Sequence, residues 1–322
     1  MKKKIYFLFL SFLPVMASFA IQIVIALFVI FGFSIIGTIR LILEGVTDPN
    51  QLISGMFTLL TDSLFNDVLM IVTFIALAGV FLLWHCKQKD KPVVAPPDKV
   101  FCFSNIAIIL ISGLAMQIAV SMCLNLILPL FPQTLENYSS LLENLVGGNV
   151  IISVISTAVL APIVEELIFR ELMSKQLRKL FPFWFANMIQ ALAFGIYHLN
   201  IVQGIYAFFI GLLFGYVAYR LKSIWASIML HGIVNASGLV LGIILPDALF
   251  ESTMGMFIFA VLCGTITILL TLLYRIPERE EQPDHPFSFA GAPEFPADID
   301  ASSMIEPVRE DILINNNNET KI

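Results

Sequence analysis

The sequence predicts an all-α, polytopic membrane protein with about eight transmembrane helices. Hydrophobic residues make up 58% of the 322 positions and charged residues only 13%, whereas a soluble domain carries roughly 25% charged residues. The mean hydropathy is +0.89. Eight apolar stretches approach the roughly 20 residues that a helix needs to cross a bilayer. They lie near residues 6–38, 67–85, 103–130, 149–171, 183–199, 203–220, 224–245 and 253–274.

The first stretch begins like a secretory signal. Lys2 to Lys4 precede an apolar run, and Ser18-Phe-Ala20 offers a small-residue cleavage pattern. A signal core is only about 7 to 15 residues long, whereas here the apolar run resumes at once through Ile21 to Ile36. We therefore expect a retained first helix.

The loop charges indicate one orientation for all eight helices. Connections after an odd number of crossings are poor in Lys and Arg, which prefer the cytoplasmic side of a membrane. We expect both termini to be cytoplasmic, and the composition suggests the cytoplasmic membrane of a prokaryote. The basic residues after an even number of crossings are Lys2 to Lys4, Lys87, Lys89, Lys91, Lys99, Lys175, Arg178, Lys179, Arg220, Lys222 and Arg275.

Three parts follow from this pattern. Residues 1–102 form two transmembrane helices and a basic, Pro-rich linker, and residues 103–275 form a compact six-helix unit with the polar clusters described below. Residues 276–322 hold eleven acidic residues against three basic ones. So polar and charged a segment cannot bury enough apolar surface to fold, and we expect a disordered cytoplasmic tail.

Several classes of site and partner are not indicated. The chain without its tail is close to neutral, which gives no reason to expect nucleic acid as a partner. The cysteines lack CxxC spacing, so neither a disulfide framework nor a zinc knuckle is predicted. Gly211 and Gly215 fit the small-xxx-small pattern of close helix packing. The four cysteines are Cys86, Cys102, Cys123 and Cys263.

The first polar cluster within an apolar stretch is Glu165-Glu166-Leu-Ile-Phe-Arg170. At 3.6 residues per turn, Glu166 and Arg170 share a helix face, while Glu165 points about 100° away. Two carboxylates this close in an apolar medium do not both ionise cheaply, so one tends to exchange a proton near neutrality, as a general base must. The alternative is a structural ion pair at the cytoplasmic end of a helix.

Two further clusters each contain a histidine. Phe194 and His198 lie one turn apart, as do His231 and Asn235. A lone histidine near a membrane interface is more often structural than catalytic. Together, however, the glutamate pair and two histidines on three helices supply a base, a water or zinc site, and donors for an oxyanion. That set is what amide hydrolysis needs.

Linear helices place these groups at different depths. His231 lies about seven residues into its helix, whereas His198 lies at the far end of its own, roughly 22 Å along at 1.5 Å per residue. A shared site therefore requires tilted, displaced or broken helices around a water-filled cavity.

The order Glu-Glu-x-x-x-Arg, Phe-x-x-x-His, His-x-x-x-Asn on successive apolar helices resembles the three motifs of the CPBP, or Abi, family of intramembrane proteases. That family includes the CAAX prenyl endopeptidases and bacteriocin-processing or immunity proteins. The resemblance covers roughly residues 103 to 275, and every motif position is present. By contrast, the chain has no HExxH motif or rhomboid-type GxSG, and we expect no Asp within a span.

The resemblance implies a role for each motif residue. Glu165 and His198 would activate the attacking water, and His231 and Asn235 would stabilise the oxyanion. Glu166 completes the catalytic set, with Arg170 and Phe194 in support. If zinc is used, its ligands would be Glu165, His198 and His231; the sequence leaves a metal-free mechanism equally open.

We therefore predict an intramembrane endopeptidase, CAAX-protease-like, acting on a membrane-associated or hydrophobic peptide or protein. Its partners would be that substrate and the lipid bilayer, and the sequence leaves the oligomeric state open. One alternative is a non-proteolytic binding or immunity module of the same fold. Another is a proton-coupled transporter, which also uses buried carboxylates and histidines, but the two related halves of many transporters are not evident.

Overall fold

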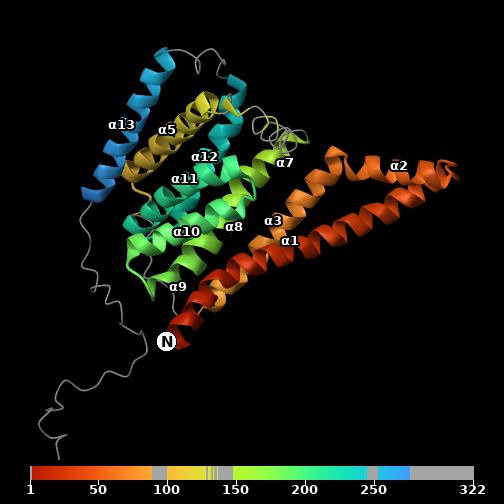
Figure 1. Cartoon of the computed structure of the whole chain (residues 1–322), viewed down its shortest axis with the longest axis horizontal. Helices are drawn as coiled ribbons and strands as arrows, with labels where there is room; N and C mark the ends of the chain where they lie inside the picture. The colour runs from red at the N-terminus through yellow and green to blue at the C-terminus, as the bar shows by residue number, and fades with distance from the viewer. Residues whose placement is uncertain are drawn as a thin grey trace, which may run out of the picture. The chain divides into compact units, whose positions relative to one another are not determined.

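The computed structural model describes residues 2–88, 100–127, 130–131, 133, 136, 148–244 and 253–275. Every regular element in these ranges is helical, which confirms the all-α membrane fold. The predicted Pro-rich linker and acidic tail lie outside the described residues. The elements (Figure 1) are α1 (Lys2–Leu43), α2 (Pro49–Leu60), α3 (Ser63–Lys87), α5 (Phe103–Ile127), α7 (Val150–Ile155), η2 (Ser156–Leu160), α8 (Ala161–Glu166), η3 (Leu167–Met173), α9 (Ser174–Arg178), α10 (Phe183–Tyr197), α11 (Ile201–Arg220), α12 (Ile224–Ile244) and α13 (Thr253–Arg275).

Each of the eight predicted spans corresponds to one apolar helix in the described part of the chain. Five of these helices are long and apolar enough to cross a membrane: Ile5–Leu43, Ser63–Lys87, Phe103–Leu124, Val150–Arg178 and Ile201–Arg220. The other three are apolar but shorter: Phe183–Tyr197, Ile224–Val240 and Phe257–Leu269. The chain is thus an integral membrane protein.

Three details differ from the sequence prediction. The fourth span does not end at 171 but continues to Arg178, because Leu172, Met173 and Leu177 remain buried. Asp67 lies within the second span and is buried, so the expectation that no Asp occupies a span was wrong. The short helix α2 was not predicted; Asp48 caps it by accepting a hydrogen bond from Asn50 N.

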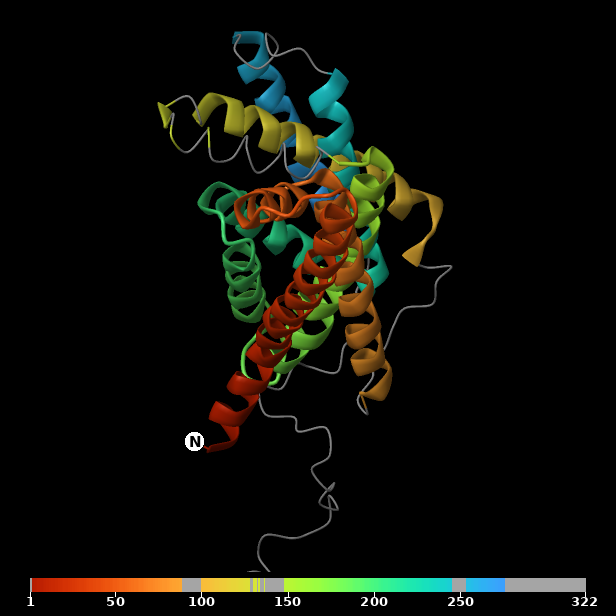
Figure 2. The same cartoon turned by 90° about the vertical axis from the view of Figure 1, so that its right-hand side faces the viewer.

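The N-terminal helices pack directly against the helix that carries the glutamates. α1 contacts η3 and α9, and α3 contacts η2, α8 and η3. Figures 1 and 2 show α1 and α3 lying beside this part of the chain. Elsewhere, α10 pairs with α11, and α5 packs on α12 and α13. All described residues belong to one compact unit, Met1–Pro286.

Residues 150–178 form one continuous helix, called the central helix below, which alternates between α and π geometry. Pro162 explains the first π segment in part, because proline lacks the N–H that an α-helix would direct at the carbonyl of Ala158. The wider π turn occupies Ser156–Leu160, and a second one covers Leu167–Met173. Glu165 and Glu166 lie between them, and π segments are frequent at functional sites.

Glycines allow three helix pairs to approach closely around this region. A Cβ on Gly232 of α12 would lie 2.8 Å from the backbone oxygen of Ala158. A Cβ on Gly195 of α10 would lie 2.5 Å from the backbone oxygen of Gly204 in α11. Gly211 and Gly215 face α10 and the Arg170 side chain in the same way, which confirms their predicted packing role.

Candidate active site

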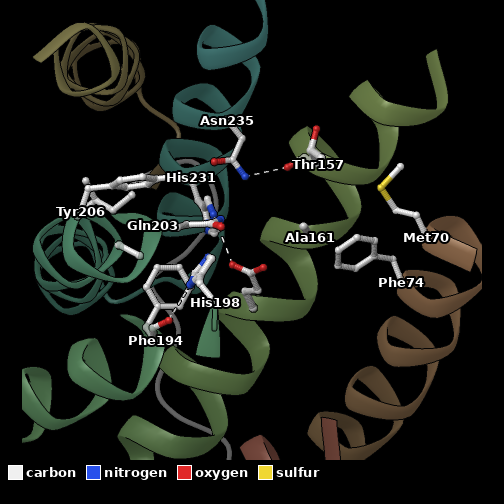
Figure 3. Close-up of a pocket in the computed structure, with 13 residues that line it drawn as sticks. Met70, Phe74, Thr157, Ala161, Phe194, His198, Gln203, Tyr206, His231 and Asn235 are labelled. Atoms are coloured by element: carbon white, nitrogen blue, oxygen red, sulfur yellow. Dashed lines mark hydrogen bonds and ion pairs between the residues drawn. The ribbon is translucent and has the colours of Figure 1, made fainter. Parts of the chain in front are cut away.

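A cavity of about 170 Å³ lies between the central helix and four other helices. This volume is enough for more than one water molecule. Figure 3 shows the side chains of α3 on one side and those of α11 on the other, with the central helix between them. The cavity is lined by Met70, Phe74, Thr157, Ala161, Glu165, Phe194, His198, Gln203, Tyr206, Ala207, Ile210, His231 and Asn235.

Glu165 presents its carboxylate to this cavity. Its Oε2 atom is buried and accepts no hydrogen bond from the described residues. The nearest cation-forming group is His231, whose Nε2 lies 3.7 Å from Oε2. A buried carboxylate oxygen normally has a hydrogen-bond partner, so this atom is placed to bind a water molecule or a substrate group.

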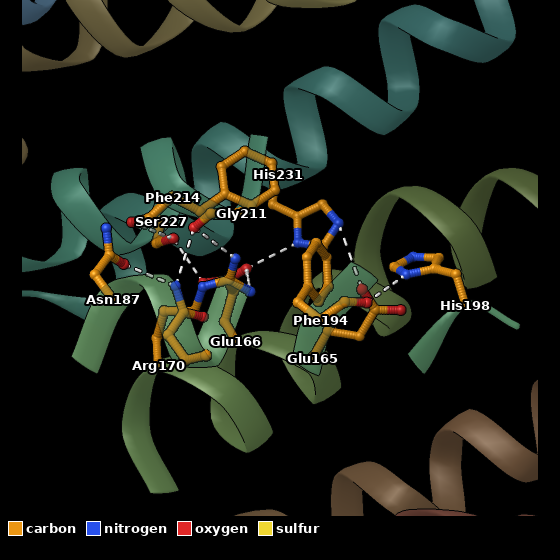
Figure 4. A network of polar contacts seen from close by, with 11 residues as sticks. Glu165, Glu166, Arg170, Asn187, Phe194, His198, Gly211, Phe214, Ser227 and His231 are labelled. Atoms are coloured by element: carbon orange, nitrogen blue, oxygen red, sulfur yellow. Dashed lines mark hydrogen bonds and ion pairs between the residues drawn. The ribbon is translucent and has the colours of Figure 1, made fainter. Parts of the chain in front are cut away.

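Glu166 lies beside the cavity rather than in its wall, and its side chain has no exposed surface. Three groups converge on its carboxylate (Figure 4). Arg170 Nη1 lies 2.9 Å from Oε1, the Ser227 hydroxyl donates to Oε2 at 2.6 Å, and His231 Nδ1 lies 2.9 Å from Oε1. Burial of a charge requires pairing of this kind. Glu166 is therefore placed to orient His231 and not to contact substrate.

His231 bridges the two glutamates. A carboxylate only accepts hydrogen bonds, so the Nδ1 atom that faces Glu166 carries a proton. The neutral ring then has a lone pair on Nε2, the atom that faces Glu165. A carboxylate that fixes the tautomer of a histidine in this way is a recurring device in catalytic sites.

His198 reaches the same cavity from the end of α10. Its Nδ1 lies 2.8 Å from the carbonyl oxygen of Phe194, so Nδ1–H donates and Nε2 is left with a lone pair. The rings of His198 and His231 both pack edge-on against Phe194, at 4.9 Å and 5.8 Å between centroids. The two histidine rings are therefore at most about 11 Å apart, the sum of these distances.

The structure brings His198 and His231 to one cavity despite the depth difference that linear helices predict. Counted from the turn that joins the central helix to α10, Glu165 lies thirteen residues up one helix and His198 fifteen residues up the other. At 1.5 Å per residue these positions are about 20 Å and 22 Å along the two axes. The close contact of Gly195 with Gly204 then brings α11 against the same end of α10.

Asn235 lies one turn beyond His231 on α12 and lines the cavity. Its Nδ2 donates to the carbonyl oxygen of Thr157 at 2.8 Å. A carboxamide nitrogen has two protons, so one remains for a substrate oxygen. The contact of Gly232 with Ala158 holds this part of α12 against η2.

Arg170 is buried in the protein and does not line the cavity. The ion pair with Glu166 that the alternative expected is present at 2.9 Å, but it lies inside the protein and not at a helix end, since the Arg170 side chain is only 2% exposed and the helix continues to Arg178. Nη2 donates to the carbonyl oxygen of Gly211 at 3.1 Å, and the guanidinium lies 4.4 Å from the Phe194 ring centroid. Phe194 thus contacts Arg170 and both histidines.

Sequence reasoning missed several residues of the site. Ser227 had a usable signal, because it precedes His231 by one turn and so shares its helix face. Thr157, Gln203 and Tyr206 carried no such signal. Met70 and Phe74 lie on α3, far from the motifs in the sequence, and only the packing of helices brings them to the cavity.

The residues suggested as zinc ligands have suitable donor atoms. Nε2 of each histidine bears a lone pair, and Glu165 offers a carboxylate. Nevertheless, within the described ranges no group of three His, Cys, Asp or Glu side chains is arranged to hold a metal ion. The four cysteines are free thiols and do not line the cavity.

Comparison with known proteins supports the motif resemblance. Residues 147–237 match the family model described as "Type II CAAX prenyl endopeptidase Rce1-like". The chain is also 31% identical over 100 residues to the Bacillus subtilis (strain 168) protein "Putative membrane peptidase YdiL". That alignment covers 31% of this chain and 40% of the relative. No solved structure shows a significant match.

The matched segment contains all seven motif residues of the candidate site, whereas α1, α3 and α13 lie outside it. Over residues 147–237 the chain is therefore similar to the type II CAAX prenyl endopeptidases of the Rce1-like family, and it spans well under two thirds of the length of the curated relative that it matches.

Proposed function

We propose that this protein is an intramembrane endopeptidase that hydrolyses a peptide bond with a water molecule activated by Glu165 and His198. The observation that carries the proposal is the Oε2 atom of Glu165, a buried carboxylate oxygen at the cavity wall with no hydrogen bond from the described residues. The family match and the relative described as a membrane peptidase support the same class of reaction.

In the proposed reaction, water binds between Glu165 and Nε2 of His198, which accepts a hydrogen bond and orients the molecule. Glu165 takes one water proton as the oxygen attacks the carbonyl carbon of the scissile bond. The carbonyl oxygen becomes an oxyanion, and the proton on Glu165 is delivered to the leaving nitrogen as the carbon–nitrogen bond breaks. Atoms and charge balance over this cycle with water as the one co-substrate.

The oxyanion is stabilised by Asn235 and His231. Asn235 contributes the amide proton that Thr157 does not use. His231 contributes when its Nε2 has been protonated from solvent before the substrate binds; that proton stays on the ring, while the proton taken from water passes through Glu165, 3.7 Å away, to the leaving nitrogen. Glu166 holds the opposite side of the ring and balances the imidazolium that results.

Substrate and orientation follow from the position of the cavity. Because it lies among apolar helices, about 20 Å along the central helix from Arg178, the scissile bond must belong to a membrane-associated or hydrophobic peptide or protein. The loop charges support cytoplasmic termini, which would direct the 178–183 turn toward the cytoplasm. We infer a prokaryotic cytoplasmic membrane as the location.

A peptide-cleavage assay tests the proposal. The purified full-length protein in detergent is incubated with a library of quenched fluorescent peptides, alongside Glu165→Ala and His231→Ala. We expect cleavage by the wild type and at least a 100-fold loss in both variants, in line with the 10²–10⁴-fold contribution of general acid–base groups. Equal cleavage in all three proteins would contradict the mechanism. No cleavage of any peptide would favour a binding module.

A further inference from the structure

One wall of the cavity is contributed by α3, which lies outside the segment that matches the family. Met70 and Phe74 are four residues apart and therefore share one helix face. Both are half-buried and both line the cavity. The next residue, Ile75, is 59% exposed and does not line it. Only one face of α3 thus takes part in the site.

Polar contacts hold α3 in place at both of its ends. Near its N-terminus, the buried Asp67 accepts a hydrogen bond from the backbone N–H of Asn149 at 2.8 Å. A Cβ on Gly148 would collide with the same carboxylate, so the fit is close. Asn149 also caps α7, where the central helix begins. This end of α3 is therefore fixed to the start of the central helix.

At the other end of α3, His85 Nδ1 lies 3.1 Å from Oε1 of Glu171. Just beyond the helix, Lys175 donates to the side-chain oxygen of Gln88 at 2.6 Å. Glu171 and Lys175 both belong to the central helix. Fixed at both ends, the segment of α3 between them holds Met70 and Phe74 at a set distance from Glu165.

The helices around the cavity contribute different kinds of side chain. The groups that serve the proposed reaction come from the central helix and from α10 to α12, whereas α3 contributes only a thioether and a phenyl ring. Figure 3 shows Met70 and Phe74 beside Ala161, on the side away from Gln203 and Tyr206. The methyl group of Ala161 leaves space between α3 and the reacting groups. An apolar surface beside a catalytic group binds an apolar side chain.

We propose that Met70 and Phe74 are specificity-determining residues, which select a bulky apolar side chain adjacent to the scissile bond. This inference rests on the proposed function and adds to it a determinant from a helix outside the family segment. Because α3 is fixed at both ends, the size of these two side chains sets the size of the substrate side chain that fits.

The test compares cleavage profiles of the full-length protein in detergent. A peptide cleaved by the wild type is varied to Ala, Val, Leu, Phe and Trp at each position flanking the cut. Met70→Ala, Phe74→Ala and the milder Phe74→Leu are compared with Ile75→Ala, the matched control on the outward face of α3. All variants are first checked for wild-type elution and thermal melting.

We expect the ratio of kcat/KM for the largest to the smallest side chain to rise at least tenfold in Phe74→Ala at one flanking position. A smaller rise is expected in Phe74→Leu and none in Ile75→Ala. A single methylene in an apolar pocket is worth about 10- to 200-fold, so tenfold is a low threshold. If the wild type is active and the Met70 and Phe74 variants have the same profile as Ile75→Ala, the specificity role of Met70 and Phe74 is contradicted. The proposed function would then still stand. Inactive wild type would overturn the proposed function and this inference with it.

Discussion

The Nδ1 atom of His231 lies 2.9 Å from Oε1 of Glu166, a carboxylate with no exposed surface. The two adjacent glutamates have different surroundings and therefore different roles. Glu166 is surrounded by Arg170, Ser227 and His231 and does not line the cavity, whereas Glu165 does. One glutamate therefore contacts the histidine from inside the protein, and the other faces the cavity.

Loss of the Ser227 hydroxyl is expected to slow the reaction by releasing Glu166. The hydroxyl lies 2.6 Å from Oε2 of Glu166, and a hydrogen bond to a charged group is worth about 1.5–3 kcal/mol. Ser227→Ala should lower kcat about tenfold or more, with KM changed less than twofold, and Ser227→Thr should restore most of it. Ser237→Ala is the control, because that hydroxyl bonds only backbone oxygens of its own helix. Equal kcat values for both alanine variants would contradict a positioning role.

Arg170 is expected to be needed for stability more than for chemistry. Removing one member of a buried ion pair costs about 3–5 kcal/mol, because the remaining charge is left without a partner. Arg170→Met should therefore lower the melting temperature sharply, and Arg170→Met combined with Glu166→Gln should recover part of the loss. Thermal melting in detergent measures both. A double variant that melts no higher than Arg170→Met would count against this ion pair.

Gly232 is expected to be required for the approach of α12 to the central helix. A Cβ there would lie 2.8 Å from the backbone oxygen of Ala158, which cannot move as a flexible side chain can. Gly232→Ala should shift His231 and Asn235 and reduce cleavage at least tenfold. Gly264→Ala in α13 is the control, since a Cβ there meets nothing within 4 Å; alanine is also favoured over glycine in a helix by roughly 0.5–1 kcal/mol. Comparable activity of the two variants would show that the contact is not needed.

Metal removal tests whether the side chains act alone. The proposed reaction uses only side chains and water, so it predicts that cleavage persists after dialysis against a strong chelator. The measurement is the cleavage rate before dialysis, after it, and after addition of zinc. Loss of activity that zinc restores would reassign Glu165, His198 and His231 as metal ligands.

The fold and the motif faces were predictable because they depend on local sequence. The lengths of the apolar stretches predicted eight helices. The spacing of four residues placed Glu166 with Arg170, and His231 with Asn235, on shared helix faces. The same rule would have identified Ser227, four residues before His231, as a neighbour of the site.

Contacts between helices were not predictable in this way. Helix periodicity says which residues share a face but not what that face meets. The presence of His198 and Glu165 in one cavity wall depends on the packing of α10 against the central helix and α11. The place of α3 in the cavity wall depends on Asp67, whose partner is a backbone N–H more than eighty residues away.

The substitution Glu165→Gln tests the central claim most directly. It keeps the shape of the side chain and removes its ability to take a proton from water. We measure kcat on a peptide cleaved by the wild type, with melting temperature and KM as checks of folding and binding. The account predicts a fall of at least 100-fold in kcat with the melting temperature unchanged. A kcat within twofold of the wild-type value would contradict it.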